Sequence, residues 1–281
     1  AFEDAPRISS RVTFLADEFI RSGEYKIITP AVDDPAPEVT APDKGENFTI
    51  TDDNLGDGGA KTKFRANVEA IKTLKTLERE KRPATAEEKE TLSKYVGWGA
   101  ISQAFDPNNN KWAAEYAELK NLLTPQEYAQ ARSTVNDAFY TSPTVIDGIY
   151  EALGNFGFDG GNVLEPAMGI GNFFGRMPED MQAHSQLYGV EIDSLSGRIA
   201  QALYPDADIA IQGFEQNRFQ NGCFDVAIGN VPFGELGFRD TVHDTTKLHD
   251  FFFAEALDSE LIDVQLRTSS TIESARTSCI H

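Results

Sequence analysis

Cysteine and histidine are scarce in this sequence, which excludes several classes of site. The 281 residues contain two cysteines, Cys223 and Cys279, which form neither a disulfide framework nor the paired spacing of a thiolate metal site. His243 and His249 are isolated histidines. The sequence therefore predicts no bound metal.

Long hydrophobic runs are also missing. The longest aromatic run, residues 251–253, is far too short to span a bilayer, and no segment resembles a signal peptide. We therefore predict a cytoplasmic protein that has no membrane partner.

Positive charge is outnumbered, with 25 Lys and Arg residues against 45 Asp and Glu residues and a formal net charge of −20. Proteins that bind DNA on their own are more often basic, because lysine and arginine neutralise the phosphates. This chain is therefore not expected to hold DNA tightly by itself. DNA as a substrate would require phosphate contacts from additional domains.

Composition and apolar spacing divide the chain into four parts. Residues 1–60 are acidic and broken by proline and glycine, which predicts an extended linker region. Residues 61–136 predict a helical subdomain, residues 137–258 an α/β domain, and residues 259–281 an atypical tail. In the helical part, apolar residues follow helical spacing, and capping boxes at Thr85 and Thr124 start helices that run to about residues 96 and 134. The buried stripe expected of the first helix is Phe64, Val68, Ile71, Leu74 and Leu77.

The α/β part contains short apolar runs that end in polar or glycine residues. Buried parallel strands show this pattern where their carboxyl ends form a ligand crevice. We expect strands to end at Glu165, at Glu191, near Ile211 and at Gly229. Helices are expected over residues 173–177 and 194–203. Ser142 should cap a further helix, and His249 and Asp250 should cap a helix over residues 251–257. The buried stripe of the helix after Ser142 should be Val145, Ile146, Ile149, Tyr150 and Leu153.

The turn after the first strand contains Gly169 and Gly171, which supply the backbone freedom for a sharp turn close to a ligand. Glu191 ends the second run, where an acid can accept hydrogen bonds from both hydroxyls of a ribose. Together they indicate a nucleoside cofactor, although an ordinary strand-to-helix turn beside a solvated acid would look similar. Phe174 stands where a nicotinamide-binding fingerprint needs its third glycine, so that cofactor is disfavoured.

The residues after the fourth run, Asn230-Val231-Pro232-Phe233, follow a strand directly. The Asn230 side chain and the Val231 carbonyl offer two hydrogen-bond acceptors, and Phe233 offers an aromatic face. This set suits a planar amino group such as N6 of adenine, whose lone pair is delocalised into the ring. An aromatic side chain can also stack on a base that has left its duplex. The alternative is a plain Asn-x-Pro turn.

The order of these motifs resembles the S-adenosylmethionine-dependent amino-methyltransferases of the N6-adenine type. Their catalytic tetrapeptide, Asn-Pro-Pro-Tyr or Asn-Pro-Pro-Phe, is similar to residues 230–233, with Val231 in place of the first proline. Their cofactor loop resembles residues 164–172, and their aromatic-Thr-Pro motif resembles residues 139–143. The chain also resembles a narrower group of these enzymes through the run Tyr95-Val96-Gly97-Trp98-Gly99. Those are very large plasmid, phage and conjugative-element proteins in which the methyltransferase domain precedes a helicase domain.

The resemblance implies a Rossmann-like methyltransferase sheet preceded by the helical subdomain, with S-adenosylmethionine as cofactor and DNA as partner. It implies a catalytic role for Asn230, Val231, Pro232 and Phe233. The implied cofactor-binding residues are Tyr140, Thr141, Glu165, Pro166, Gly169, Gly171, Asn172, Glu191, Ile192, Phe214 and Glu215. Residues 234–247 would form a base-recognition loop.

Two other functions stay open. Glutamine-N5 protein methyltransferases use a nearly identical tetrapeptide, and RNA is another conceivable substrate. A non-catalytic module that binds cofactor or DNA within a larger helicase protein is the second alternative. A methyltransferase sheet needs further strands after the fourth, so the resemblance implies a sheet that is truncated there or completed by another chain.

Overall fold

A computed structural model describes residues 45–99, 101–136, 141–237 and 242–259. Most of the expected linker, the tail after residue 259 and Tyr140 lie outside these residues.

The part before the sheet is helical, as its apolar spacing predicts. Helix α2 (Ala60–Glu80) buries the whole expected stripe and ends at Lys81, which adopts a left-handed conformation. Both capping boxes form, and they start α3 (Ala86–Leu92) and α5 (Pro125–Ser133). Between them lie α4 (Ala113–Leu122) and the short 3-10 helices η1 (Ser102–Phe105) and η2 (Asn110–Trp112); η3 (Thr134–Asn136) follows α5.

The sheet has four parallel strands in the order β3-β2-β1-β4. They are β1 (Asn162–Glu165), β2 (Gln186–Glu191), β3 (Asp208–Ile211) and β4 (Val226–Ala227). This order reverses direction beside β1, as in doubly wound Rossmann-type sheets. The expected α/β class and the first three strand ends are confirmed. Strand β4 ends before the expected Gly229.

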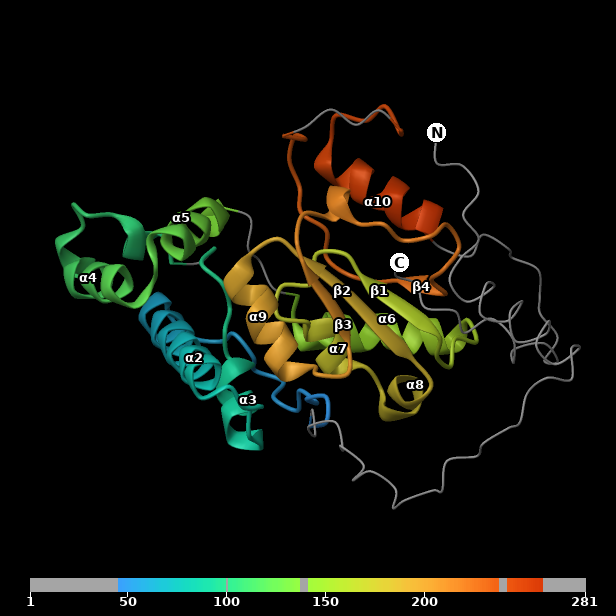
Figure 1. Cartoon of the computed structure of the whole chain (residues 1–281), viewed down its shortest axis with the longest axis horizontal. Helices are drawn as coiled ribbons and strands as arrows, with labels where there is room; N and C mark the ends of the chain where they lie inside the picture. The colour runs from blue at the N-terminus through green and yellow to red at the C-terminus, as the bar shows by residue number, and fades with distance from the viewer. Residues whose placement is uncertain (1–44, 100, 137–140, 238–241, 260–281) are drawn as a thin grey trace, which may run out of the picture. The chain divides into compact units, whose positions relative to one another are not determined.

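Helices cover both faces of the sheet (Figure 1). Neighbouring residues of β1 point to opposite faces, so that Val163 joins the larger core and Leu164 the smaller one. The larger core also contains the helical part, α6 (Pro143–Asn155), α7 (Asn172–Arg176) and α9 (Ser194–Leu203). The smaller core lies under α10 (Leu248–Ser259) and η4 (Phe214–Gln216). The remaining helix, α8 (Glu179–Ala183), precedes β2.

Several local expectations are wrong. Helix α3 ends at Leu92 rather than near residue 96, because the chain turns into a tight loop there. In α6, Val145 is 52% exposed and so lies outside the buried stripe. Ser142 does occupy the expected N-cap position before Pro143, although its side chain makes no capping hydrogen bond. Helix α10 begins at Leu248, so His249 and Asp250 lie inside its first turn and do not cap it.

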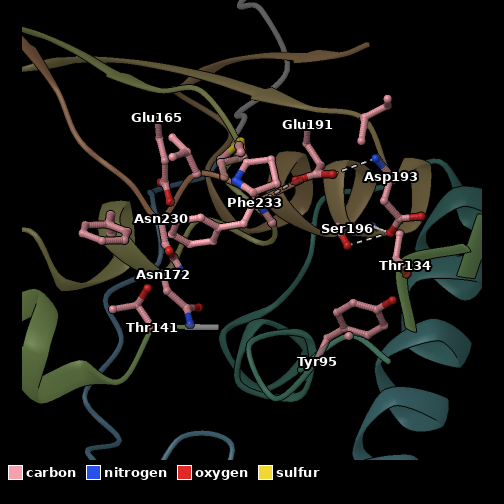
Figure 2. Close-up of a pocket in the computed structure, with 18 residues that line it drawn as sticks. Tyr95, Thr134, Thr141, Glu165, Asn172, Glu191, Asp193, Ser196, Asn230 and Phe233 are labelled. Atoms are coloured by element: carbon pink, nitrogen blue, oxygen red, sulfur yellow. Dashed lines mark hydrogen bonds between the residues drawn. The ribbon is translucent and has the colours of Figure 1, made fainter. Parts of the chain in front are cut away.

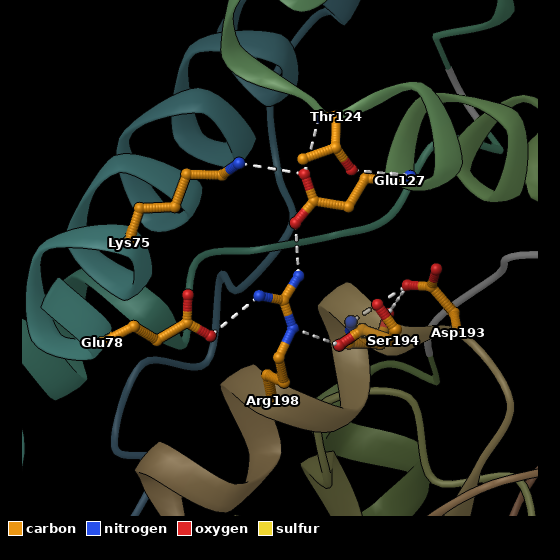
Figure 3. Close-up of polar contacts among 8 residues, drawn as sticks. Lys75, Glu78, Thr124, Glu127, Asp193, Ser194 and Arg198 are labelled. Atoms are coloured by element: carbon orange, nitrogen blue, oxygen red, sulfur yellow. Dashed lines mark hydrogen bonds and ion pairs between the residues drawn. The ribbon is translucent and has the colours of Figure 1, made fainter. Parts of the chain in front are cut away.

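One ion cluster ties the helical part to the sheet (Figure 3). Glu127, on α5, accepts from Lys75 of α2 at 2.9 Å and from Arg198 of α9 at 2.5 Å. Arg198 also donates to Glu78 of α2 at 2.8 Å. Burial alone would raise the pKa of Glu127, but hydrogen bonds from the Thr124 amide, Lys75 and Arg198 outweigh it and lower the pKa to about 2.

We predict that Glu127→Gln destabilises the fold by about 1–3 kcal/mol at neutral pH, because the amide lacks the negative charge and one of the two acceptor oxygens that bind Lys75 and Arg198 in partly buried hydrogen bonds. The depressed pKa means that this contribution is present above the unfolded-state pKa of about 4.5 and disappears as the pH falls toward 2. Urea unfolding at pH 7 and at pH 3 should therefore show a smaller difference at pH 3. Glu118→Gln, which breaks an exposed pair with Lys72, is the control and should cost under about 0.5 kcal/mol. Equal losses of unfolding free energy in the two variants at pH 7 would contradict the stabilising role of Glu127.

Candidate functional site

A cavity of about 380 Å³ opens at the carboxyl ends of β1, β2 and β4 (Figure 2). Glu165 ends β1, Glu191 ends β2 and Asn230 follows β4, so parallel pairing brings three segments distant in sequence to one place. The sequence-predicted residues that line the cavity are Thr141, Glu165, Gly169, Asn172, Glu191, Ile192, Asn230, Val231, Pro232 and Phe233.

The structure does not bring every predicted residue to the cavity. Phe214 is buried in the smaller core, where its ring stacks on Phe252 with centroids 4.9 Å apart. Glu215 is exposed next to it, and neither residue lines the cavity. Pro166 and Gly171 lie beside lining residues in the chain without lining it themselves. These placements leave the cofactor-binding role that the resemblance implies for Phe214 and Glu215 without support.

Other lining residues were not predicted as site residues. Tyr95, Gly97 and Thr134 come from the helical part, and Asp193 and Ser196 come from the start of α9. The only sequence signal for the first two was the run of residues 95–99, which carried a family likeness and no assigned role. Asp193 and Ser196 look like an ordinary helix cap in the sequence, and that cap forms. The Asp193 side chain accepts a hydrogen bond from the Ser196 amide at 2.9 Å.

The glycine loop between β1 and α7 has the sharp turn that its sequence predicts. Gly169 and Gly171 have φ angles of +58° and +82°, in the left-handed region that favours glycine. The loop is fixed to β2, because the Met168 amide donates to the Val190 carbonyl at 3.1 Å. A Cβ on Gly171 would lie 2.6 Å from the ring of Tyr204, so this glycine packs against the core.

Two buried carboxyl groups stand at the floor of the cavity. Glu191 accepts from the amides of Gly169 and Asp193, each at 2.7 Å, and burial raises its pKa to about 7. Burial, with a smaller contribution from the charge of Glu191, raises the pKa of Glu165 well above its ordinary value. Carboxylates this close to one another favour a ligand that brings positive charge.

Several buried oxygen atoms at the cavity lack a hydrogen-bond partner. They are Oε2 of Glu165, Oδ1 of Asn172 and Oδ1 of Asp193. Unsatisfied buried polar atoms are rare in folded proteins, and they call for a bound donor. The Oδ1 atoms of Asn172 and Asp193 are acceptors, and Oε2 of Glu165 accepts when its carboxyl group is ionised, so the complementary ligand carries N–H or O–H groups.

The charge of the cavity wall has one sign. Among the lining residues that the structure describes, Glu165, Glu191 and Asp193 are acidic and none is Lys, Arg or His. Such a wall repels phosphate and attracts cations. The arrangement therefore fits a positively charged nucleoside and does not fit a dinucleotide with its pyrophosphate.

The mouth of the cavity is formed by residues 230–233. Phe233 is 71% exposed, and its ring lies 5.4 Å from the ring of His249 on α10. The segment that follows folds back on itself at its base, where Glu235 and Lys247 form an antiparallel bridge. The Leu236 amide donates to Thr246, and the Leu248 amide donates to the Gly234 carbonyl at 2.9 Å. These bonds hold Phe233 beside the start of α10.

Within residues 45–99, 101–136, 141–237 and 242–259, no group of three or more His, Cys, Asp or Glu side chains is arranged to hold a metal ion. In the same residues no helix is long and apolar enough to cross a membrane.

Comparisons with known proteins give one match to a phage protein. No model of a known protein family matches the sequence. Over 122 residues, the chain is 36% identical to Defense against restriction protein B of Escherichia phage P1. The matched segment covers 43% of this chain and 5% of that protein, so the chain spans a small part of its relative. Among solved structures, one from Listeria monocytogenes, described as a class I S-adenosylmethionine-dependent methyltransferase, is 15% identical with a TM-score of 0.41, covering 71% of each chain.

We predict that Gly171→Ala destabilises the fold by about 1–3 kcal/mol, because the new Cβ meets Tyr204 and the backbone is left-handed there. The matched control is Gly148→Ala on α6, where a Cβ meets no atom within 4 Å. This control should be neutral or stabilise by up to about 1 kcal/mol. Urea denaturation of both variants measures the difference. A destabilisation by Gly148→Ala that equals that of Gly171→Ala would refute the packing role of Gly171.

Proposed function

We propose that this chain is a methyltransferase domain that transfers a methyl group from S-adenosylmethionine to N6 of adenine in DNA. One observation carries the proposal: Asn230, Val231 and Phe233 stand at the mouth of a cavity whose described lining residues include three acidic side chains and no basic one. An acceptor pair with an exposed aromatic ring suits a planar amino group, and an acidic wall suits a cationic nucleoside.

S-adenosylmethionine fits the residues present. It carries a sulfonium and an ammonium group, and its ammonium and ribose hydroxyls are hydrogen-bond donors. Oε2 of Glu165 and Oδ1 of Asn172 are buried acceptors that lack donors. Glu191 has carboxylate lone pairs beyond those used by the Gly169 and Asp193 amides, and they can accept from the ribose. When bound, the cofactor supplies an electrophilic methyl carbon.

The residues at the mouth orient the amine. The Asn230 side-chain oxygen and the Val231 carbonyl each accept from one proton of the N6 amino group, which favours a pyramidal nitrogen and frees its lone pair. Held in this way, the nitrogen would accept the methyl group that S-adenosylmethionine supplies, leaving S-adenosylhomocysteine, and would lose one N–H proton. Pro232 stiffens the turn, and Phe233 stacks on the flipped base. Positioning and exclusion of water provide the catalysis, so no covalent enzyme intermediate is required.

DNA as the substrate draws support from the phage relative. Its name describes defence against restriction, and methylation of a base is one way to make a site resistant to cleavage. The net charge of −20 means that this chain needs additional domains for phosphate contacts. A helicase domain in the same protein is the partner that the sequence resemblance favours.

A methylation assay with labelled S-adenosylmethionine and adenine-containing DNA tests the proposal, with the product identified by mass spectrometry. We expect N6-methyladenine from the unaltered protein and a rate at least about 100-fold lower from Asn230→Ala, which loses an acceptor for the amine. Asn230→Ala should bind S-adenosylmethionine as tightly as the unaltered protein in calorimetric titration, whereas Glu191→Ala should bind it more weakly. If the protein methylates a peptide glutamine or RNA but not DNA, its substrate is that protein or RNA rather than DNA. Tight cofactor binding without methylation of any substrate would favour a non-catalytic module.

Cofactor affinity should depend on pH through Glu191. Its pKa of about 7 means that the carboxylate that accepts from the ribose hydroxyls is mostly protonated at pH 6 and mostly ionised at pH 8. We expect binding of S-adenosylmethionine to be roughly tenfold weaker at pH 6 than at pH 8. Calorimetric titration across this range measures the effect, and Glu191→Gln should flatten it. A profile for Glu191→Gln as steep as that of the unaltered protein would assign the titration to another group.

A further inference from the structure

The turn formed by Tyr95, Val96, Gly97 and Trp98 connects α3 to η1, and the proposed reaction gives it no role. Tyr95 and Gly97 line the cavity, although they lie in the helical part of the chain. Tyr95 packs edge-on against Trp98, with ring centroids 6.1 Å apart, and Trp98 packs edge-on against Phe105 at 5.3 Å. Trp98 is 1% exposed, so its ring is packed in the core and anchors the turn. The turn is therefore a part of the cavity wall that is packed against the core.

Asn67 holds this turn in place from α2. Its side chain is fully buried, and its Nδ2 donates to the Gly97 carbonyl at 2.6 Å while its Oδ1 accepts from the Val96 amide at 2.9 Å. Gly97 has a φ of +64°, which lets the chain present these two backbone groups to one side chain. A carboxylate lacks the donor and an aliphatic side chain lacks both groups, so a primary amide is required.

A second contact fixes the neighbouring part of the same wall. Thr134 lines the cavity immediately after α5, and α5 is held to α9 by the Glu127–Arg198 ion pair. In Figure 2, Tyr95 and Thr134 stand on the side of Asp193 and Ser196, away from Thr141 and Asn172. Oδ1 of Asp193 is buried there without a partner. The helical part thus faces the end of the cavity that Glu191 and Asp193 form.

We propose that the Tyr95–Trp98 turn is a wall of the cofactor site at its nucleoside end, and that Asn67 is a positioning residue that sets cofactor affinity through this turn. The nucleoside half of the cofactor would lie between the turn and the strand-end residues Glu191 and Asp193. This inference rests on the proposed function, because it takes S-adenosylmethionine as the ligand. It assigns to the helical part a share in cofactor binding.

The test compares Asn67→Leu with Leu74→Ala, a core variant on the same helix whose side chain is buried away from the cavity lining. Both variants lose stability, and thermal unfolding measures how much. Calorimetric titration at a temperature where both are folded should show that Asn67→Leu binds S-adenosylmethionine and S-adenosylhomocysteine at least about tenfold more weakly. Leu74→Ala should stay within about twofold of the unaltered protein. The two ligands share the nucleoside, so their affinities should fall together.

Steady-state kinetics separate positioning from general damage. For Asn67→Leu we expect a raised KM for S-adenosylmethionine, with kcat at saturating cofactor and the KM for DNA within about twofold of the unaltered values. Unchanged cofactor affinity in folded Asn67→Leu, or an equal loss of affinity in Leu74→Ala, overturns the inference. If Asn67→Leu does not fold, Tyr95→Leu replaces it, and unchanged affinity in that variant overturns the inference equally. Failure of the unaltered protein to bind S-adenosylmethionine would instead refute the proposed function.

Discussion

The side-by-side burial of two carboxyl groups, Glu165 and Glu191, at the ends of neighbouring parallel strands is the constraint on which the cavity depends. Taking such groups out of water is unfavourable unless they are hydrogen-bonded or matched by positive charge. The glycine loop supplies one of these hydrogen bonds, because the turn at Gly169 directs its amide toward the Glu191 carboxyl group. Among the lining residues that the structure describes there is no lysine or arginine, so no basic side chain of the wall neutralises these two carboxyl groups.

Local signals in the sequence predicted the sheet and its glycine loop well. Strand ends, capping boxes and positive-φ glycines are set by residues a few positions apart, and the chain from residue 141 to residue 212 follows them closely. The capping box at Thr124 shows why: both of its hydrogen bonds join residues separated by three positions. The parallel pairing of β1 with β2 and β4 then brought Glu165, Glu191 and Asn230 together, as strand order in a doubly wound sheet requires.

What the sequence could not predict depends on contacts between distant residues. Phe214 follows β3 at a position where either face of the sheet is accessible, and its burial under α10 is decided by the neighbouring rings of Phe251 and Phe252. Helix α3 stops early because Asn67, 29 positions before Val96, takes the backbone groups of the turn. The helical part shares one hydrophobic core with one face of the sheet, so a boundary drawn by composition near residue 136 does not mark an energetic boundary.

The paired bonds at the base of the loop after Phe233 have an evolutionary consequence. The hydrogen bonds from Leu248 to Gly234 and from Leu236 to Thr246, together with the Glu235–Lys247 bridge, close the base of this loop. The entropy of closing such a loop grows slowly with its length, so residues can be inserted or exchanged beyond the closure at little cost to folding. A change in the length of this loop would therefore leave the positions of residues 230–233 largely unchanged.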